Sequence, residues 1–250
     1  MEYTFSKDVK FRKEQNSIFI CNCKLLQDYK IRLKYFKTMN KINRGVSVQK
    51  LNKDEKPLFN DFMILNFLKP LYLKEIKTKN YKKVYNFLKE NIPLKRSYAF
   101  LLNKLKNNPK FFMGLYLDEE LIGVIQGFHR DDYTLLSEIA VDLRFRGRGF
   151  GSKLLHAFEK KVKGKLKVGA LDDVIHFYEK CGYSKSIQIQ IPWKLFQKMK
   201  NAIKHIKILS LKKINNLAIM EISIKDKHKL LKLVPSASIV SKQYIFTKCI

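Results

Sequence analysis

The chain has 250 residues, of which 46% are hydrophobic and 12% aromatic, enough for a folded core and too many for a disordered chain. No stretch approaches the roughly 18 uninterrupted apolar residues that a membrane span requires. The beginning of the chain lacks the apolar segment of a secretory signal. These features predict a cytoplasmic protein with no membrane partner.

Lysine and arginine number 51 against 22 aspartates and glutamates, a formal net charge of +29. Such a surface attracts nucleic acid or acidic partners. No nucleic-acid-binding motif of fixed spacing appears, so a merely basic surface is an equal alternative. The close pair Cys21 and Cys23 lacks two further ligands nearby, and the five histidines are scattered, so the sequence predicts no metal site.

Residues 1–70 carry their own pattern of short elements. The segment V-K-F-R-K-E, followed by an apolar strand, resembles the PqqD-like domains that bind leader peptides. Hairpin, helix and helix in this order predict a small winged-helix-like unit. The expected elements are a hairpin over 9–20, a helix over 25–42 and a helix over 58–68 that Asp54 caps and Pro70 terminates.

Residues 71–192 alternate between strand and helix patterns, which predicts an α/β (α+β) sandwich with a mixed β-sheet flanked by helices. The expected strands are 71–76, 111–117, 121–128, a strand from Tyr133, 166–170 and 183–191, and the expected helices are 81–88, 98–105, a helix from Ser152 and 172–181.

An apolar strand ending in Val141 runs into the glycine-rich stretch R-G-R-G-F-G, behind which apolar residues recur at helical spacing. Gly147, Gly149 and Gly151 alternate there, so the backbone can come close to a ligand. The N–H groups of the helix's first turn favour a bound pyrophosphate, with added charge from Arg146 and Arg148. An ordinary glycine-rich turn is the alternative.

This stretch resembles the signature of the GNAT superfamily, the acyl-CoA-dependent N-acyltransferases: Arg or Gln, two residues, Gly, one residue, Gly or Ala. Arg146, Gly149 and Gly151 occupy its fixed positions. The resemblance implies a strand beside the pantetheine arm, a loop around the CoA pyrophosphate, and a backbone N–H near Val141 for the oxyanion. The implied cofactor-binding residues are Ile139, Ala140, Val141, Arg146, Gly147, Arg148, Gly149, Phe150, Gly151 and Ser152.

A second stretch, V-I-H-F-Y-E-K-C-G-Y over residues 174–183, is similar to a helix-and-turn motif of the same family. The similarity implies that Tyr178 is the catalytic acid that protonates the departing CoA thiolate. One position departs from the family pattern, because Leu171 stands where an asparagine is common. This departure puts one hydrogen bond to CoA in doubt.

Attack by an amine needs a base, for which a carboxylate is usual. Glu138 begins the strand beside the thioester in the family arrangement and is the first choice. A solvated carboxylate, or a partner for a loop arginine, is an equally good interpretation of it. Asp172 and Asp173 are alternatives, although either also suits an N-cap. The fifth-strand base of some relatives is replaced by Lys167.

Residues 193–250 exceed what a minimal family member needs. The patterns predict a helix over 193–206, strands over 208–211 and 217–224, and an extended run over 238–249. Such an α+β extension closes the acceptor side or forms a homodimer.

The resemblance implies an acetyl-CoA-dependent N-acetyltransferase, with acetyl-CoA as cosubstrate. The extra flanking regions favour a protein or peptide amine over a small molecule. The main alternative is a non-catalytic GNAT-fold protein that senses CoA or holds RNA through its basic surface. In a third interpretation the modified amine belongs to a nucleic-acid or ribosome-associated partner.

Overall fold

The computed structural model describes residues 1–130, 132–170 and 172–250. Contacts divide the chain into two compact units, residues 1–127 with 138–161 and residues 128–137 with 162–250. Each unit holds a hydrophobic cluster of its own. The finer division into 1–70, 71–192 and 193–250 stays a prediction.

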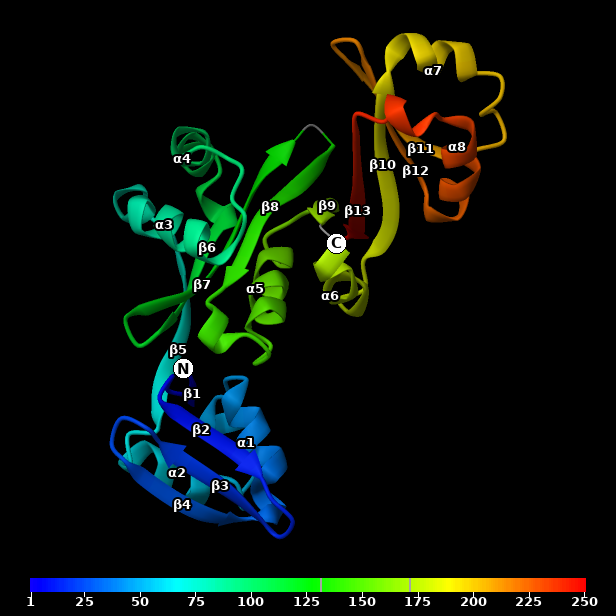
Figure 1. The fold of residues 1–250 in the computed structure, drawn as a ribbon. Coiled ribbons are helices and arrows are strands. Elements are labelled where there is room, and N and C mark those ends of the chain that lie inside the picture. The colour runs from blue at the N-terminus through cyan, green and yellow to red at the C-terminus, as the bar shows by residue number, and fades with distance from the viewer. Residues whose placement is uncertain (131, 171) are drawn as a thin grey trace. The chain divides into compact units, whose positions relative to one another are not determined.

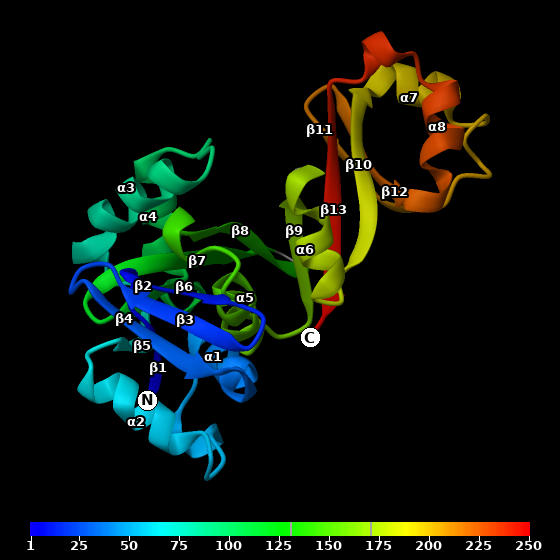
Figure 2. The same cartoon turned by 60° about the horizontal axis from the view of Figure 1, so that its bottom comes forward.

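The N-terminal part of the first unit contains an antiparallel sheet of three strands, β2 (Val9–Lys13), β3 (Ser17–Asn22) and β4 (Gln27–Arg32). Helices α1 (Phe36–Asn43) and α2 (Lys56–Ile64) lie together on one side of these strands (Figure 2). Apolar residues from both helices and from β3 are buried in one cluster. The antiparallel pairing of β2 with β3 confirms the predicted hairpin.

The predicted helix over 25–42 is wrong in its first half, where the chain forms β4. Tyr29 and Ile31 turn toward the cluster while Lys30 and Arg32 are exposed, a two-residue period. Tyr29 also fits a helical spacing with later apolar residues, so a short apolar run satisfied both periods. Residues 27–32 form a strand and not a helix because they pair with β3.

The second predicted helix ends earlier than expected, at Ile64, and Asn66 then reverses the chain with φ 57°. Pro70 does not terminate a helix but lies inside strand β5 (Leu68–Glu75), where its carbonyl accepts a hydrogen bond from the N–H of Asp118. Asp54 does not cap α2 either, because the cap position belongs to Glu55.

The main sheet of the first unit contains β1 (Glu2–Phe5), β5, β6 (Phe112–Leu117) and β7 (Glu120–Arg130) in this order, all antiparallel. Strand β8 (Tyr133–Val141) follows, and its end leads to the glycine-rich loop. Figure 1 shows α3 and α4 to one side of the strands β6 to β8 and α5 to the other. The three helices are α3 (Tyr81–Asn91), α4 (Tyr98–Asn107) and α5 (Phe150–Glu159).

The second unit orders its strands as β9, β13, β10, β12 and β11. The start of β8 pairs in parallel with β9, from Thr134 to Leu136. The other pairs in this unit are antiparallel. The strands are β9 (Lys165–Ala170), β10 (Ser184–Pro192), β11 (Ile208–Ile214), β12 (Leu217–Ser223) and β13 (Ser241–Cys249), and the helices are α6 (Ile175–Lys180), α7 (Trp193–Met199) and α8 (Lys227–Leu233).

The end of the chain completes this sheet, because β13 lies between β9 and β10. The segment from α7 to α8 is thus an insertion between two neighbouring antiparallel strands. It packs against the isoleucines of β10 in the second cluster. The α+β content predicted for residues 193–250 is found, whereas the helix over 193–206 is shorter and α8 was missed.

Among the described residues, no helix is both long and apolar enough to cross a membrane.

Candidate functional site

The glycine-rich loop begins where β8 ends. Ala140 is buried, whereas Ile139 and Val141 are half-buried on the opposite face of the strand. The N–H of Asp142 donates to the carbonyl of Ile122 at 3.0 Å, which anchors the strand end to β7. The direction in which the loop leaves the sheet is thereby fixed.

Gly147 and Gly149 have left-handed dihedral angles, with φ +78° and +80°. A Cβ built on Gly147 meets nothing within 4 Å, and one on Gly149 meets only Cγ of Arg44, at 3.9 Å. The glycines are therefore required by backbone conformation and not by crowding. The open space above them is where a ligand can approach.

Helix α5 starts directly after Gly149, and no side chain in the described part of the chain caps this end. The N–H of Lys153 donates to the carbonyl of Gly149 at 3.0 Å. The first turn carries no acidic residue. Gly151 and Ser152 are half-buried in this turn, and Phe150 is buried against Phe145. This end of the helix attracts anions through its N–H groups and the helix dipole.

Both loop arginines donate hydrogen bonds to backbone carbonyls. Arg146 donates to the carbonyls of Val141 at 3.1 Å and Asn91 at 2.9 Å. Arg148 is only 8% exposed and donates to the carbonyl of Phe5 at 3.1 Å, with its guanidinium carbon 5.1 Å from the Phe145 ring centroid. Burial lowers the pKa of Arg148. The prediction that Arg148 adds side-chain charge to the pyrophosphate site is therefore not supported, because its guanidinium is buried.

The N-terminal residues of the chain hold the loop and its helix. Besides the contact of Phe5 with Arg148, Glu2 forms an ion pair with Lys153 in the first turn of α5. Gly45 packs against the same lysine, since a Cβ there would lie 3.0 Å from its Nζ. No local sequence pattern indicates these contacts, because they join residues more than 100 positions apart.

Glu138 is 5% exposed, and both of its oxygens accept hydrogen bonds. Arg96 donates to Oε1 at 2.6 Å and Gln126 to Oε2 at 2.8 Å, and Tyr81 donates to the Gln126 amide oxygen at 3.0 Å. Burial is the main cause of the raised pKa of Tyr81, so its hydroxyl stays protonated. The partner of Glu138 is therefore an arginine outside the loop, which the sequence analysis did not single out.

Tyr178 lies on α6 in the second unit and is 3% exposed. Its ring stacks on Phe246 of β13, with centroids 5.3 Å apart, and packs edge-on against Tyr183 and Phe177. Burial raises its pKa, and the nearby Cys181 adds to the shift. The phenol is thus held in its protonated form. Phe177 is half-buried.

The other predicted residues of this region have weaker positions. Asp172 and Asp173 are exposed in a 3-10 turn before α6, and neither is its N-cap, which is Val174. Leu171 lies outside the described residues. Lys167 is half-buried and forms an ion pair with the buried Glu221.

Over residues 1–130, 132–170 and 172–250, no three His, Cys, Asp or Glu side chains gather in a group that could hold a metal ion.

Residues 72–183 match the model of the acetyltransferase (GNAT) family. No curated protein matches the chain. The solved structures to which the chain is similar include Ard1 from Thermoplasma volcanium, with 19% identity, TM-score 0.47 and coverage of 72% of this chain and 97% of that one. Arabidopsis thaliana Naa50 in complex with the bisubstrate analogue CoA-Ac-MVNAL has 15% identity, TM-score 0.43 and coverage of 62% and 99%. A GNAT family acetyltransferase from Elizabethkingia anophelis with acetyl-CoA bound has 17% identity, TM-score 0.42 and coverage of 72% and 98%.

Replacing Arg148 by methionine should lower the free energy of unfolding by about 1.5–3 kcal/mol, the range for a hydrogen bond to a charged group. The carbonyl of Phe5 would lose its donor while the aliphatic volume stays similar. Urea unfolding followed by circular dichroism measures the change. Arg12→Met, at an exposed arginine, is the matched control and should change stability by less than about 0.5 kcal/mol. Equal stability of the two variants would contradict the structural role of Arg148.

Proposed function

We propose, from the match of residues 72–183 to the model of the acetyltransferase (GNAT) family, that the protein transfers the acetyl group of acetyl-CoA to an amine of a protein or peptide. The observation that carries the cosubstrate assignment is the uncapped start of α5 behind two left-handed glycines. Such a helix start binds phosphate groups through its backbone. The residues proposed to hold the CoA pyrophosphate are 147–152, and those proposed beside its pantetheine arm are 139–141.

Acetyl transfer forms a bond from the amine nitrogen to the thioester carbonyl carbon and breaks the bond from that carbon to sulfur. An ammonium loses one proton to become the neutral amine that attacks, and the nitrogen loses a second as the amide forms. One of the two is released to solvent in each turnover. The CoA thiolate leaves with the electron pair of the broken bond and takes up a proton. The products are an amide and free CoA, and the chain has to supply a proton acceptor and a proton donor.

Tyr178 is the proposed proton donor. Its raised pKa keeps the proton on the phenol but also makes it a weaker acid, so the proposal rests on the position of Tyr178 in the motif. Since a thiol titrates near 8.5, the thiolate is already a tolerable leaving group. Tyr178 should therefore accelerate the reaction without being indispensable to it.

Glu138 is the proposed proton acceptor, acting through a water molecule. Its two hydrogen-bond donors, Arg96 and Gln126, hold the carboxylate in one orientation. A carboxylate has about four acceptor sites, so two hydrogen bonds leave acceptor sites that a water molecule can use. The burial of Glu138 is the main observation against this role. In the competing interpretation, Glu138 is a positioning residue that holds Arg96.

The acceptor is proposed to be a protein or peptide because the chain has large segments on both sides of the matched domain. A net charge of +29 favours acceptors with acidic residues near the amine. Turnover of acetyl-CoA with a panel of acidic and neutral peptides, polyamines and RNA tests the assignment. Salt-sensitive RNA binding without any turnover would favour the alternative of a binding protein.

Gly149→Glu should abolish CoA binding, because it places a side chain and a negative charge where the pyrophosphate is proposed to lie. Isothermal titration with CoA at physiological salt measures the affinity. The control is Gly164→Glu, at an open glycine with φ +85°, which adds the same charge and backbone strain elsewhere. Retained CoA affinity in Gly149→Glu would refute the loop assignment.

Tyr178→Phe should lower kcat by up to roughly 10²-fold while CoA affinity stays the same. In the wild type, kcat should show no alkaline decline from this residue up to about pH 10, since its pKa is raised above the ordinary value of about 10. Initial rates between pH 7 and 10 measure both effects. Tyr183→Phe, at the neighbouring ring, is the control. An unchanged kcat in Tyr178→Phe would remove it from the acid role.

Glu138→Gln should lower kcat/KM by roughly 10²-fold or more if the carboxylate takes the proton. The substitution conserves shape, and a flip of the Gln126 amide can restore hydrogen bonding to the new side chain. The melting temperature shows whether the fold is kept. A loss of stability with little loss of rate would instead make Glu138 a positioning residue for Arg96.

A further inference from the structure

The cations closest to the glycine-rich loop in the sequence already have partners within the protein. Arg144 pairs with Asp142 and Glu120, and this ion pairing raises its pKa. The side chains of Arg146 and Arg148 donate to backbone carbonyls, and Lys153 pairs with Glu2. Ion pairs therefore engage Arg144 and Lys153. Arg148 is buried, and the exposed Arg146 is held by two backbone carbonyls.

Arg44 differs from these cations. It is exposed, and its guanidinium makes no hydrogen bond or ion pair with any residue that the structure describes. Its Cγ lies 3.9 Å from the position of a Cβ on Gly149, the residue at the start of α5. The Arg44 side chain therefore passes close to the start of α5, where the N–H groups proposed to bind the pyrophosphate lie.

The backbone at Arg44 is held in place by its surroundings. Arg44 ends α1, and Gly45 follows with φ +84°. A Cβ on Gly45 would lie 2.6 Å from Cδ2 of Leu71 and 3.0 Å from Nζ of Lys153, so this turn packs closely against β5 and the first turn of α5. Val46 then pairs with Tyr3 through two backbone hydrogen bonds of 2.9 and 3.0 Å. The arginine thus extends from a fixed turn.

We propose that Arg44 is a cofactor-binding residue whose guanidinium binds the pyrophosphate of CoA, an inference that rests on the proposed function. Arginine suits this task, because its planar fork of donors matches two phosphate oxygens at once. The backbone N–H groups of α5 and the guanidinium of Arg44 then contact the same anion. The N-terminal part of the chain, outside the matched family domain, supplies this cation.

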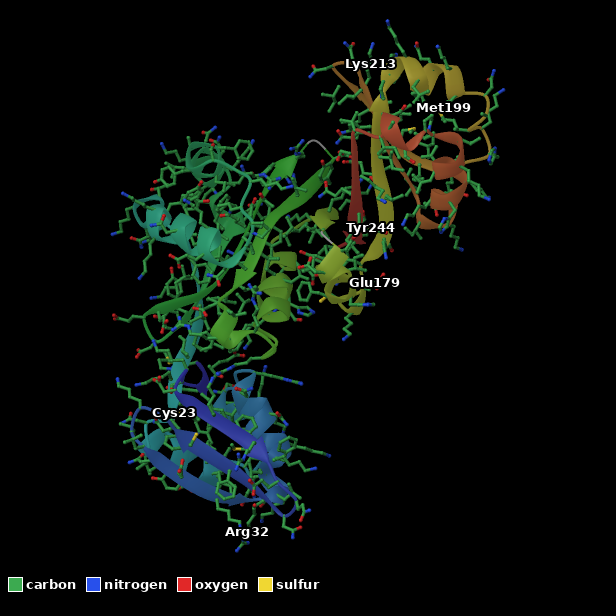
Figure 3. All side chains as sticks on the ribbon, in the orientation of Figure 1. Cys23, Arg32, Glu179, Met199, Lys213 and Tyr244 are labelled. Atoms are coloured by element: carbon green, nitrogen blue, oxygen red, sulfur yellow. The ribbon has the colours of Figure 1, made fainter. Side chains whose placement is uncertain are left out.

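The test is the affinity for CoA of Arg44→Gln, measured by isothermal titration at physiological ionic strength, where weak nonspecific attraction is screened. We expect about tenfold weaker binding, which corresponds to about 1.4 kcal/mol. The matched control is Arg32→Gln, which removes the same charge from an exposed arginine at the far end of the N-terminal sheet (Figure 3). It should leave the affinity within twofold. Arg44→Lys, which keeps the charge and loses the fork, should fall between wild type and Arg44→Gln.

Dephospho-CoA, which keeps the pyrophosphate and lacks the 3′-phosphate, identifies the phosphate involved. The tenfold loss in Arg44→Gln should persist with this ligand. A loss that disappears with dephospho-CoA, or an equal loss in Arg32→Gln, would overturn the proposal, as would unchanged affinity in Arg44→Gln. Failure of the wild type to bind CoA is a distinct result, because it refutes the proposed function itself.

Discussion

The hydrogen bond from the buried Arg148 guanidinium to the carbonyl of Phe5 is the constraint on which the candidate site depends. It draws an arginine of the glycine-rich loop inward and ties the loop to β1, 143 positions away in the sequence. The glycines on either side keep their open faces outward. A residue that looks like a phosphate ligand in the sequence is therefore part of the scaffold that orients the loop backbone.

This arrangement separates two tasks that one arginine cannot perform together. A guanidinium that donates to buried carbonyls stabilises the loop, whereas one that binds a ligand has to remain accessible before the ligand arrives. Arg146 and Arg148 perform the first task, and Arg144 is held by the carboxylates of Asp142 and Glu120. Backbone N–H groups, which cost no side-chain entropy to position, remain for the ligand. Residues 1–70 consequently support the loop through Glu2, Phe5 and Gly45.

The second unit shows a comparable dependence on distant segments. The ring of Tyr178 is buried by Phe246, which belongs to the last strand of the chain. Because burial is the main cause of its raised pKa, part of this shift depends on β13 being inserted between β9 and β10. The extension after residue 192 therefore includes a strand that the environment of Tyr178 requires.

The sequence by itself determined the strand, glycine turn and helix around residues 138–159 and the tyrosine helix, because dihedral preferences and hydrophobic periods are set by neighbouring residues. It also indicated the family that residues 72–183 match. Only the tertiary structure decided that residues 27–32 form a strand, that Arg96 is the partner of Glu138, and that Arg148 is buried. Strand pairing, ion pairing and burial depend on residues brought together by folding, and local sequence patterns do not specify such partners.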